Sequence, residues 1–211
     1  MAVSDALVVG EDWISEHYLT TDTTKESFLA RVLERRKEWE ALEKPVDPST
    51  APTPTPRSRF RSERSRLEEL LAALPADDAG SLTGAALEAA ERLDALLREI
   101  LGFSSSEYRL TERGPVTLVR PVGDEGPAPL ALLRARPVTT VEDLLVKDAL
   151  TLAEAWEPVD LGDPTAPVLE GAEPVESVSR ALSTLMTDEH GPAFALVLAG
   201  QWALVAERER W

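Results

Sequence analysis

One short apolar run in this sequence is followed by charged side chains in a spacing that suits metal-dependent chemistry. Residues 123–137 read GDEGPAPLALLRARP, so an acidic turn with Asp124 leads into a strand-like segment that ends in Arg134 and Arg136. Side chains two apart on a strand point to the same face, and acidic residues placed in this way hold Mg²⁺. Arginine cannot ligate a cation and repels it. The spacing therefore singles out Asp124, Arg134 and Arg136 as candidate site residues, and the two arginines exclude a cation ligand at either strand position.

Other candidate catalytic or metal-binding residues are few. The chain has no cysteine, which excludes disulfides, thiolate catalysis and cysteine-bound zinc. Its two histidines are His17, beside Tyr18, and His190, which follows Asp188 and Glu189 in a turn-like stretch. His17 and Tyr18 could form an acid–base pair, and Asp188, Glu189 and His190 could bind a metal ion. We expect structural roles for both histidines, because a histidine beside a helix start is usually structural and the side chains of adjacent residues diverge. No GxG or GxxxxGK[ST] loop occurs either, so we expect no metal and no cofactor in this chain.

A run of arginines at residues 57–66, RSRFRSERSR, is the basic stretch of an otherwise acidic chain. The net charge is −16, from 38 acidic and 22 basic residues, which excludes a general basic surface for nucleic acid. The run either contacts DNA phosphates or forms a solvated linker that offsets the acidic body. We favour the linker, because the surrounding negative charge repels DNA at long range. The candidate phosphate contacts are Arg57, Arg59, Arg61, Arg64 and Arg66.

The N-terminal part of the chain has helical periodicity and then a proline-rich stretch. Thr23 and Glu26 fit a capping box, and apolar residues recur at helical spacing after them. This predicts an amphipathic helix over residues 23–43. Residues 45–56 hold five prolines in twelve positions, which predicts an extended or disordered spacer.

The remainder of the chain predicts one domain of the α+β (or α/β) class. Short β-like runs are separated by Gly and Pro turns, and Gly200-Gln201 joins the last two as a hairpin. We expect a small mixed sheet flanked by helices, with the sheet formed by residues 108–136 and 193–206 and the helices by residues 83–101 and 174–186. The predicted segments are an N-terminal segment with the amphipathic helix (1–44), a Pro-rich then Arg-rich linker (45–66), and a domain that is cut short at its C-terminus (67–211).

The layout of residues 123–137 resembles the metal strand of PD-(D/E)XK nucleases. In that family an Asp before the strand and a Glu on it hold Mg²⁺, and a Lys two positions after the Glu helps to position or activate the water. Arg134 stands at the position of the Glu and Arg136 at that of the Lys. The resemblance implies a nuclease-like fold with a dead site, and the alternative is an ordinary edge strand with solvated arginines.

Two longer stretches resemble the N-terminal region of large bacterial type II/IIG-like restriction–modification adenine-N6 DNA methyltransferases. They are GEDWISEHYLTTDTTKESFLARVLERRKE at residues 10–38 and FALVLAGQWALVAERERW at residues 194–211. In that family a nuclease-like region precedes the methyltransferase domain. Methyl transfer needs a glycine-bearing cofactor loop and an NPPY-type motif, and neither occurs here. The resemblance therefore implies S-adenosylmethionine only for a longer parent enzyme.

The expected function is a non-catalytic N-terminal module of such a methyltransferase, in the context of DNA methylation and phage defence. The expected partners are DNA, through the parent enzyme, and either the remaining methyltransferase domains or a partner subunit. We expect a cytoplasmic location, because no apolar run is long enough to span a membrane and the first residues lack the features of a signal peptide. Two alternatives stay open: a small acidic interaction or DNA-mimic protein, and an active metal-dependent nuclease with acids drawn from Glu99, Glu107, Asp124 and Glu142.

Overall fold

The chain consists of two units. The computed structural model describes residues 28–44, 47, 49–74, 84–104, 106–138, 140–146, 149–162 and 173–210. Internal contacts separate Met1–Arg61 from Ser62–Trp211. This boundary falls inside a helix, α3 (Pro56–Ala72), whereas the sequence predicted that a linker ends at residue 66. The His17–Tyr18 pair and the predicted capping box at residues 23–26 lie outside the described residues.

The first unit contains α2 (Phe28–Glu43), an irregular proline-rich segment and the first residues of α3. The proline-rich segment is tied back to α2, because the Thr53 N–H donates to the Leu42 carbonyl at 3.0 Å. Thr55 then caps α3 through reciprocal hydrogen bonds with Ser58 of 2.9 and 3.2 Å. Pro56 takes the first helical position, where no N–H is needed. The arginine-rich stretch that was expected as a linker is consequently helical.

The second unit is built on a five-stranded mixed sheet with the strand order β1-β2-β3-β4-β5. The first three strands form an antiparallel meander, β3 and β4 are parallel, and β4 and β5 form an antiparallel hairpin. A parallel pair needs a long crossover, which here contains two helices, α5 and α6. The elements of this unit are α4 (Ala85–Leu101), β1 (Tyr108–Arg113), β2 (Val116–Pro121), β3 (Leu130–Arg134), α5 (Val141–Leu144), α6 (Val178–Thr187), β4 (Phe194–Ala199), β5 (Trp202–Glu207) and the 3-10 helix η2 (Arg208–Arg210).

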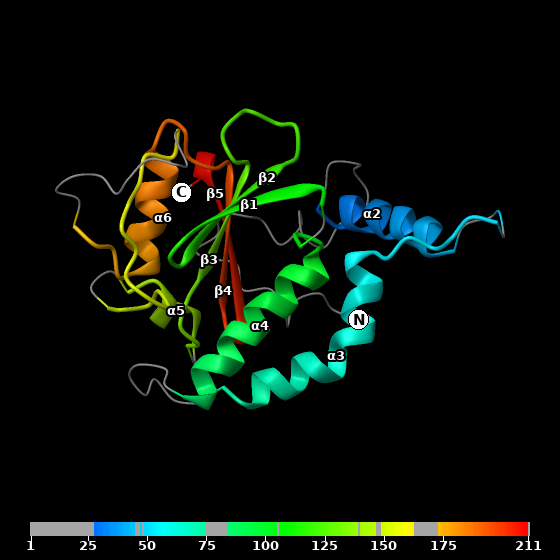
Figure 1. The fold of residues 1–211 in the computed structure, drawn as a ribbon, viewed down its shortest axis with the longest axis horizontal. Coiled ribbons are helices and arrows are strands. Elements are labelled where there is room, and N and C mark those ends of the chain that lie inside the picture. The colour runs from blue at the N-terminus through cyan, green and yellow to red at the C-terminus, as the bar shows by residue number, and fades with distance from the viewer. Residues whose placement is uncertain are drawn as a thin grey trace. The chain divides into compact units, whose positions relative to one another are not determined.

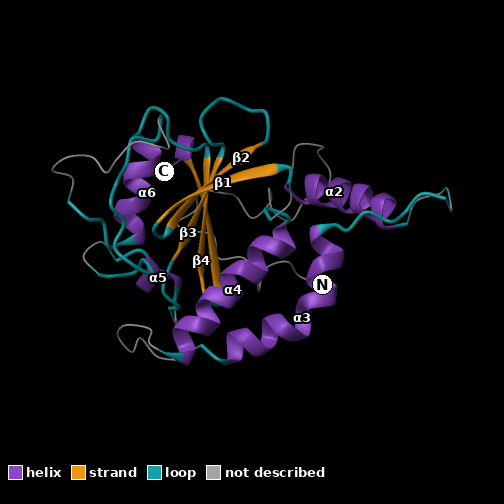
Figure 2. Ribbon diagram, in the orientation of Figure 1, coloured by secondary structure: helices purple, strands orange, loops and turns teal. Residues whose placement is uncertain are grey.

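Helices cover both faces of this sheet, so the mixed sheet flanked by helices is confirmed. Figure 1 shows α4 on one side of the strands and α6 on the other, and Figure 2 shows the same layers by element type. The main core lies between the sheet and α6, where Leu133, Val197 and Leu182 are fully buried. Side chains alternate along a strand, so Leu132 faces the other side, where Leu93 of α4 is also buried.

Capping residues decide where the helices begin and end. The helix α6 begins at Val178 and not at the expected Pro174, because the Ser177 side chain accepts a hydrogen bond from the Arg180 N–H at 3.3 Å. Gly102 ends α4 in the left-handed conformation, with φ of 91°. Among the described helices, none combines the length and the apolar character that crossing a membrane requires.

The turn after α6 needs a residue without a side chain. A methyl group on Gly191 would lie 1.9 Å from the carbonyl oxygen of Leu185 and 3.0 Å from that of Asp188. Arg208, which follows β5, donates to the Gly191 carbonyl at 2.9 Å. The turn is therefore packed against the end of α6 and tied to the end of the hairpin.

Gly191→Ala is expected to destabilise the second unit by about 1–3 kcal/mol, because the added methyl group overpacks against main-chain atoms that cannot move alone. Gly126→Ala is the matched control, since its methyl group would meet only the Asp124 side chain, at 3.2 Å. Urea unfolding of both variants measures the effect. Equal unfolding midpoints for the two variants would contradict the expectation.

Candidate functional site

Arg134 ends β3 and is held in place by an ion pair and by backbone contacts. Its guanidinium lies 2.9 Å from the Glu154 carboxylate and donates to the Gly114 carbonyl at 3.2 Å. Its own N–H donates to the Pro115 carbonyl at 2.8 Å, and it is in register with Leu198 of β4. The side chain is 30% exposed. Solvent therefore reaches a guanidinium whose charge is already paired.

A buried carboxylate, Asp94 of α4, belongs to the same charge network. Asp94 is 8% exposed, and Arg98 contacts it at 2.8 Å while also contacting Glu112 of β1 at 2.6 Å. Burial raises the pKa of Asp94, against the opposing charges of Arg98 and Arg134. Burial acts to lower the pKa of Arg98, but its bond to Glu112 and the charge of Asp94 outweigh burial and raise it. The arrangement neutralises charge between the helix and the strands.

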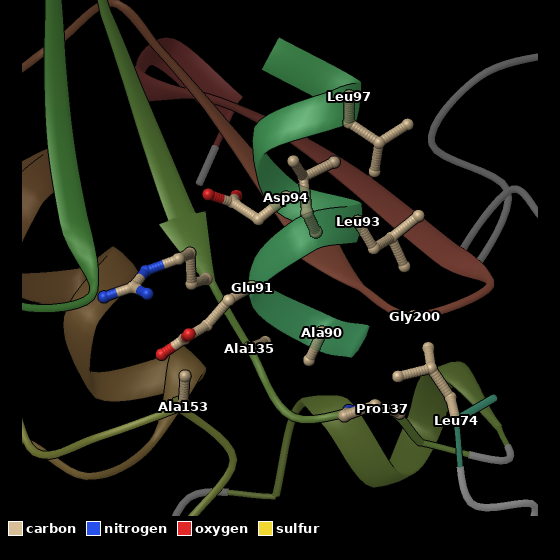
Figure 3. Close-up of a pocket in the computed structure, with 12 residues that line it drawn as sticks. Leu74, Ala90, Glu91, Leu93, Asp94, Leu97, Ala135, Pro137, Ala153 and Gly200 are labelled. Carbon is tan, nitrogen blue, oxygen red and sulfur yellow. The ribbon is translucent and has the colours of Figure 1, made fainter. Parts of the chain in front are cut away.

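The network borders an open groove between α4 and the strands β3 and β4. The groove is open to solvent and has a volume of about 50 Å³. Figure 3 shows the side chains of Glu91 and Asp94 on one side of α4 and those of Leu93 and Leu97 on the other. Apart from these carboxylates and Arg134, aliphatic side chains and Gly200 form most of the lining. The site is thus an apolar groove with charges along one border.

The structure separates Asp124 from the two arginines that the sequence placed with it. Asp124 lies in the turn between β2 and β3, where its carboxylate accepts a hydrogen bond from the Gly126 N–H at 2.9 Å. Arg134 is at the other end of β3, a strand about 13 Å long at 3.3 Å per residue. Arg136 lies beyond the strand and donates to the Leu152 carbonyl at 3.2 Å. These three residues therefore do not form one site.

Asp94 and Glu154 were missed by the sequence analysis. The signal for Asp94 was present, because this acid stands within the apolar stripe of α4, four residues after Ala90 and three before Leu97. No comparable signal existed for Glu154, which lies in an irregular segment twenty residues from Arg134. Only the tertiary structure brings it to the strand.

The acids of the active-nuclease alternative lie on different elements. Within the described ranges, no group of three or more His, Asp or Glu side chains is placed to hold a metal ion. Glu99 lies on α4, Glu107 in the segment before β1, Asp124 in the β2–β3 turn and Glu142 on α5.

His190 lies in the turn after α6. Its backbone N–H donates to the Asp188 side chain at 2.8 Å, and its Nδ1 lies 3.7 Å from the Glu189 carboxylate.

The helical conformation of α3 divides the five candidate DNA-binding arginines between two faces. At about 100° per residue, Arg57, Arg61 and Arg64 fall on one stripe, and Arg59 and Arg66 on the opposite one. A single straight DNA backbone cannot contact both stripes. Several of the five are also engaged: Arg57 with Glu40 and Glu43, Arg59 with the Pro54 carbonyl, Arg64 with Glu68, and Arg66 with Glu63. A five-contact phosphate site is therefore not built here.

Arg57 instead links α3 to the end of α2. Its guanidinium contacts Glu40 at 2.7 Å and Glu43 at 2.6 Å. The Thr55 hydroxyl also donates to Glu43. The bonds from Arg57 and Thr55 lower the pKa of Glu43 to about 2, and Arg57 lowers the pKa of Glu40 as well. These carboxylates hold the first unit together.

Arg57→Gln is expected to return the pKa of Glu43 from about 2 towards its ordinary value of 4.5. Because folding depresses this pKa, the contact stabilises the first unit above pH 4.5, and the stabilisation is lost as the pH falls towards 2. NMR titration of the Glu43 carboxyl group measures the shift. Arg59→Gln is the control, since Arg59 donates to the Pro54 carbonyl; an equal shift in both variants would count against the assignment.

Asp94→Asn is expected to remove one pH-dependent part of the stability of the second unit. Folding raises the pKa of Asp94, so the folded chain keeps this proton to a higher pH than the unfolded chain. Stability then falls as the pH rises from about 4 through the raised pKa. Urea unfolding of wild type and variant between about pH 3.5 and 8 tests this, with Glu88→Gln, an exposed acid of the same helix, as control. A wild-type-minus-variant difference that stays constant with pH would refute it.

Compared with known proteins, the chain matches no family model, no curated protein and no solved structure. The assignment of a function therefore depends on the geometry of this chain and on the resemblances carried by its own residues.

Proposed function

We propose that this chain is a non-catalytic N-terminal module of a restriction–modification adenine-N6 DNA methyltransferase. The observation that carries the proposal is the ion pair of Arg134 with Glu154 at 2.9 Å, at the strand position where PD-(D/E)XK nucleases have a metal-binding Glu. A guanidinium at this position accepts no ligand bond and repels Mg²⁺. In this proposal Arg134 forms an ion pair with Glu154 and does not help to bind a metal ion.

The architecture around Arg134 supports a degenerate nuclease-like domain. A small mixed sheet lies between helices α4 and α6, and the strand that carries Arg134 is central in it. On the side of α4, Asp94 is neutralised by Arg98 at 2.8 Å. Charges that a metal would otherwise balance are thus balanced by two arginines within the chain.

The two stretches of the sheet that carry the resemblances are neighbours in space. The first, residues 130–134, is β3; the second, which begins at Phe194, forms the hairpin of β4 and β5. Their parallel pairing places Leu130 beside Phe194 and Arg134 beside Leu198. Both stretches therefore belong to one folded unit.

The module acts as a scaffold in this proposal. It would contact the remaining methyltransferase domains or a partner subunit, and DNA through the assembled enzyme. S-adenosylmethionine would bind the methyltransferase part, since the cofactor loop and the NPPY-type motif do not occur in these 211 residues. The assembly would act on cellular DNA in the cytoplasm.

The proposal is tested on the reading frames that contain or adjoin this coding sequence. We expect an NPPY-type motif and a glycine-bearing loop in one of them. We also expect the purified chain not to cleave supercoiled plasmid with Mg²⁺ or Mn²⁺. Adenine-N6 methylation by the co-expressed methyltransferase, measured by methylation-sensitive digestion, is expected to fall when this chain is deleted.

Three results would overturn the proposal. One is metal-dependent cleavage by the wild-type chain that is lost in Asp94→Asn or Asp124→Ala, which would establish an active nuclease. Another is the absence of any methyltransferase motif in those reading frames. The third is methylation that does not depend on the presence of this chain.

A further inference from the structure

We propose that the groove between α4 and the strands β3 and β4 binds a polypeptide segment that carries an aliphatic side chain beside a lysine or arginine. The groove is the site described above, and the inference assigns it a ligand class. It is independent of the proposed function, because it depends only on the shape and charge of this surface.

The walls of the groove suit aliphatic side chains. Leu97 of α4 and Pro137 after β3 are half-buried, and Leu93 and Leu198 are buried behind them. The space is open to solvent and about 50 Å³ in volume, which is room for a few water molecules or one short aliphatic side chain. A side chain that enters it would cover apolar surface that is now exposed to water, which favours binding.

One end of the groove is closed by a tight approach of two loops. Gly200 turns the β4–β5 hairpin with a φ of 65°. A Cβ at this residue would lie 3.0 Å from the Cβ of Pro137 and 3.3 Å from Cδ1 of Leu74. The absence of a side chain therefore lets the hairpin pack directly against these residues, and the groove keeps a defined end wall.

The charges along the border favour a cation. The two arginines of the network, Arg98 and Arg134, are matched by the carboxylates of Asp94, Glu112 and Glu154. Glu91 adds a fourth carboxylate at the groove. This residue is exposed and has no hydrogen-bond or ion-pair partner in the part of the chain that the structure describes.

The resulting excess of negative charge selects among ligands. Complementary charge favours a basic segment, and like charge disfavours phosphates, nucleotides and acidic peptides. The net charge of −16 on the whole chain acts in the same direction at longer range. Apolar walls and an unpaired carboxylate together point to a basic and aliphatic peptide.

The test uses three N-acetylated, amidated tripeptides, Leu-Arg-Leu, Leu-Gln-Leu and Leu-Glu-Leu, which differ only in charge. Each is titrated at low salt into the full ¹⁵N-labelled chain, and amide chemical shifts are followed. We expect shifts at Leu97, Ala153 and Gly200, which line the groove. The arginine peptide is expected to bind about two- to fivefold more tightly than the glutamine peptide, as for an exposed ion pair, and the glutamate peptide most weakly.

Two matched variants distinguish charge recognition in the groove from a general attraction of basic peptides to the acidic chain. Glu91→Gln is expected to remove the preference for the arginine peptide. Glu88→Gln removes the same charge one turn earlier on α4, at a residue that pairs with Arg92 at 3.3 Å, and is expected to keep the preference. The inference is overturned by the absence of shifts with all three peptides, by shifts outside the groove, by equal dissociation constants, or by a preference that survives Glu91→Gln.

Discussion

The parallel pairing of β3 with β4 is the contact on which the second unit depends. It joins residues 130–134 to residues 194–198, so the 59 residues between them must return along the sheet. That return places α6 and its apolar side chains against one face, where Leu133 and Val197 are fully buried. The same pairing places Arg134 beside Leu198 and thereby sets one wall of the groove.

The charge network follows from the burial of Asp94, an acidic residue of α4. A carboxylate such as Asp94 loses hydration when it is buried, and the loss must be compensated by a partner. Arg98 supplies that partner at 2.8 Å, and its second contact, with Glu112, fastens α4 to β1. Arg134 repeats the arrangement on β3, with Glu154 as its partner. Removing Arg98 would leave the buried Asp94 without its ion-pair partner, so this pair also specifies how α4 packs on the strands.

The distribution of charge has consequences for what this molecule can bind. The arginines of α3 form the most basic stretch of the chain, but Arg57 is paired with Glu40 and Glu43. The helix then divides the others between opposite stripes. The groove of the second unit, by contrast, is bordered by more carboxylates than arginines. The two surfaces therefore differ in how their charges are arranged: along α3 the arginines lie on two stripes, and at the groove carboxylates outnumber arginines.

The sequence alone was sufficient for the class of fold and for most of its elements. Periodicity and turn residues predicted strands within residues 108–136 and 193–206, where the structure has β1 to β5, and the hairpin at Gly200. These features are local: a strand alternates every two residues, and a glycine at a turn needs only its own backbone conformation. The helical state of residues 57–66 was not predicted, because the cap at Thr55 and the contacts of Arg57 with α2 outweigh the composition of the segment.

The composition of the site was decided by the tertiary structure. The sequence identified Arg134 as the unusual residue and grouped it with Asp124 and Arg136, which are near it in the chain. The folded strand sets Asp124 at its opposite end, whereas helix packing and the crossover bring Asp94 and Glu154 to Arg134's surroundings. Spacing along a strand determines which side chains share a face. The residues opposite that face are set by contacts between segments twenty or more residues apart in the chain. A local sequence pattern does not predict such contacts.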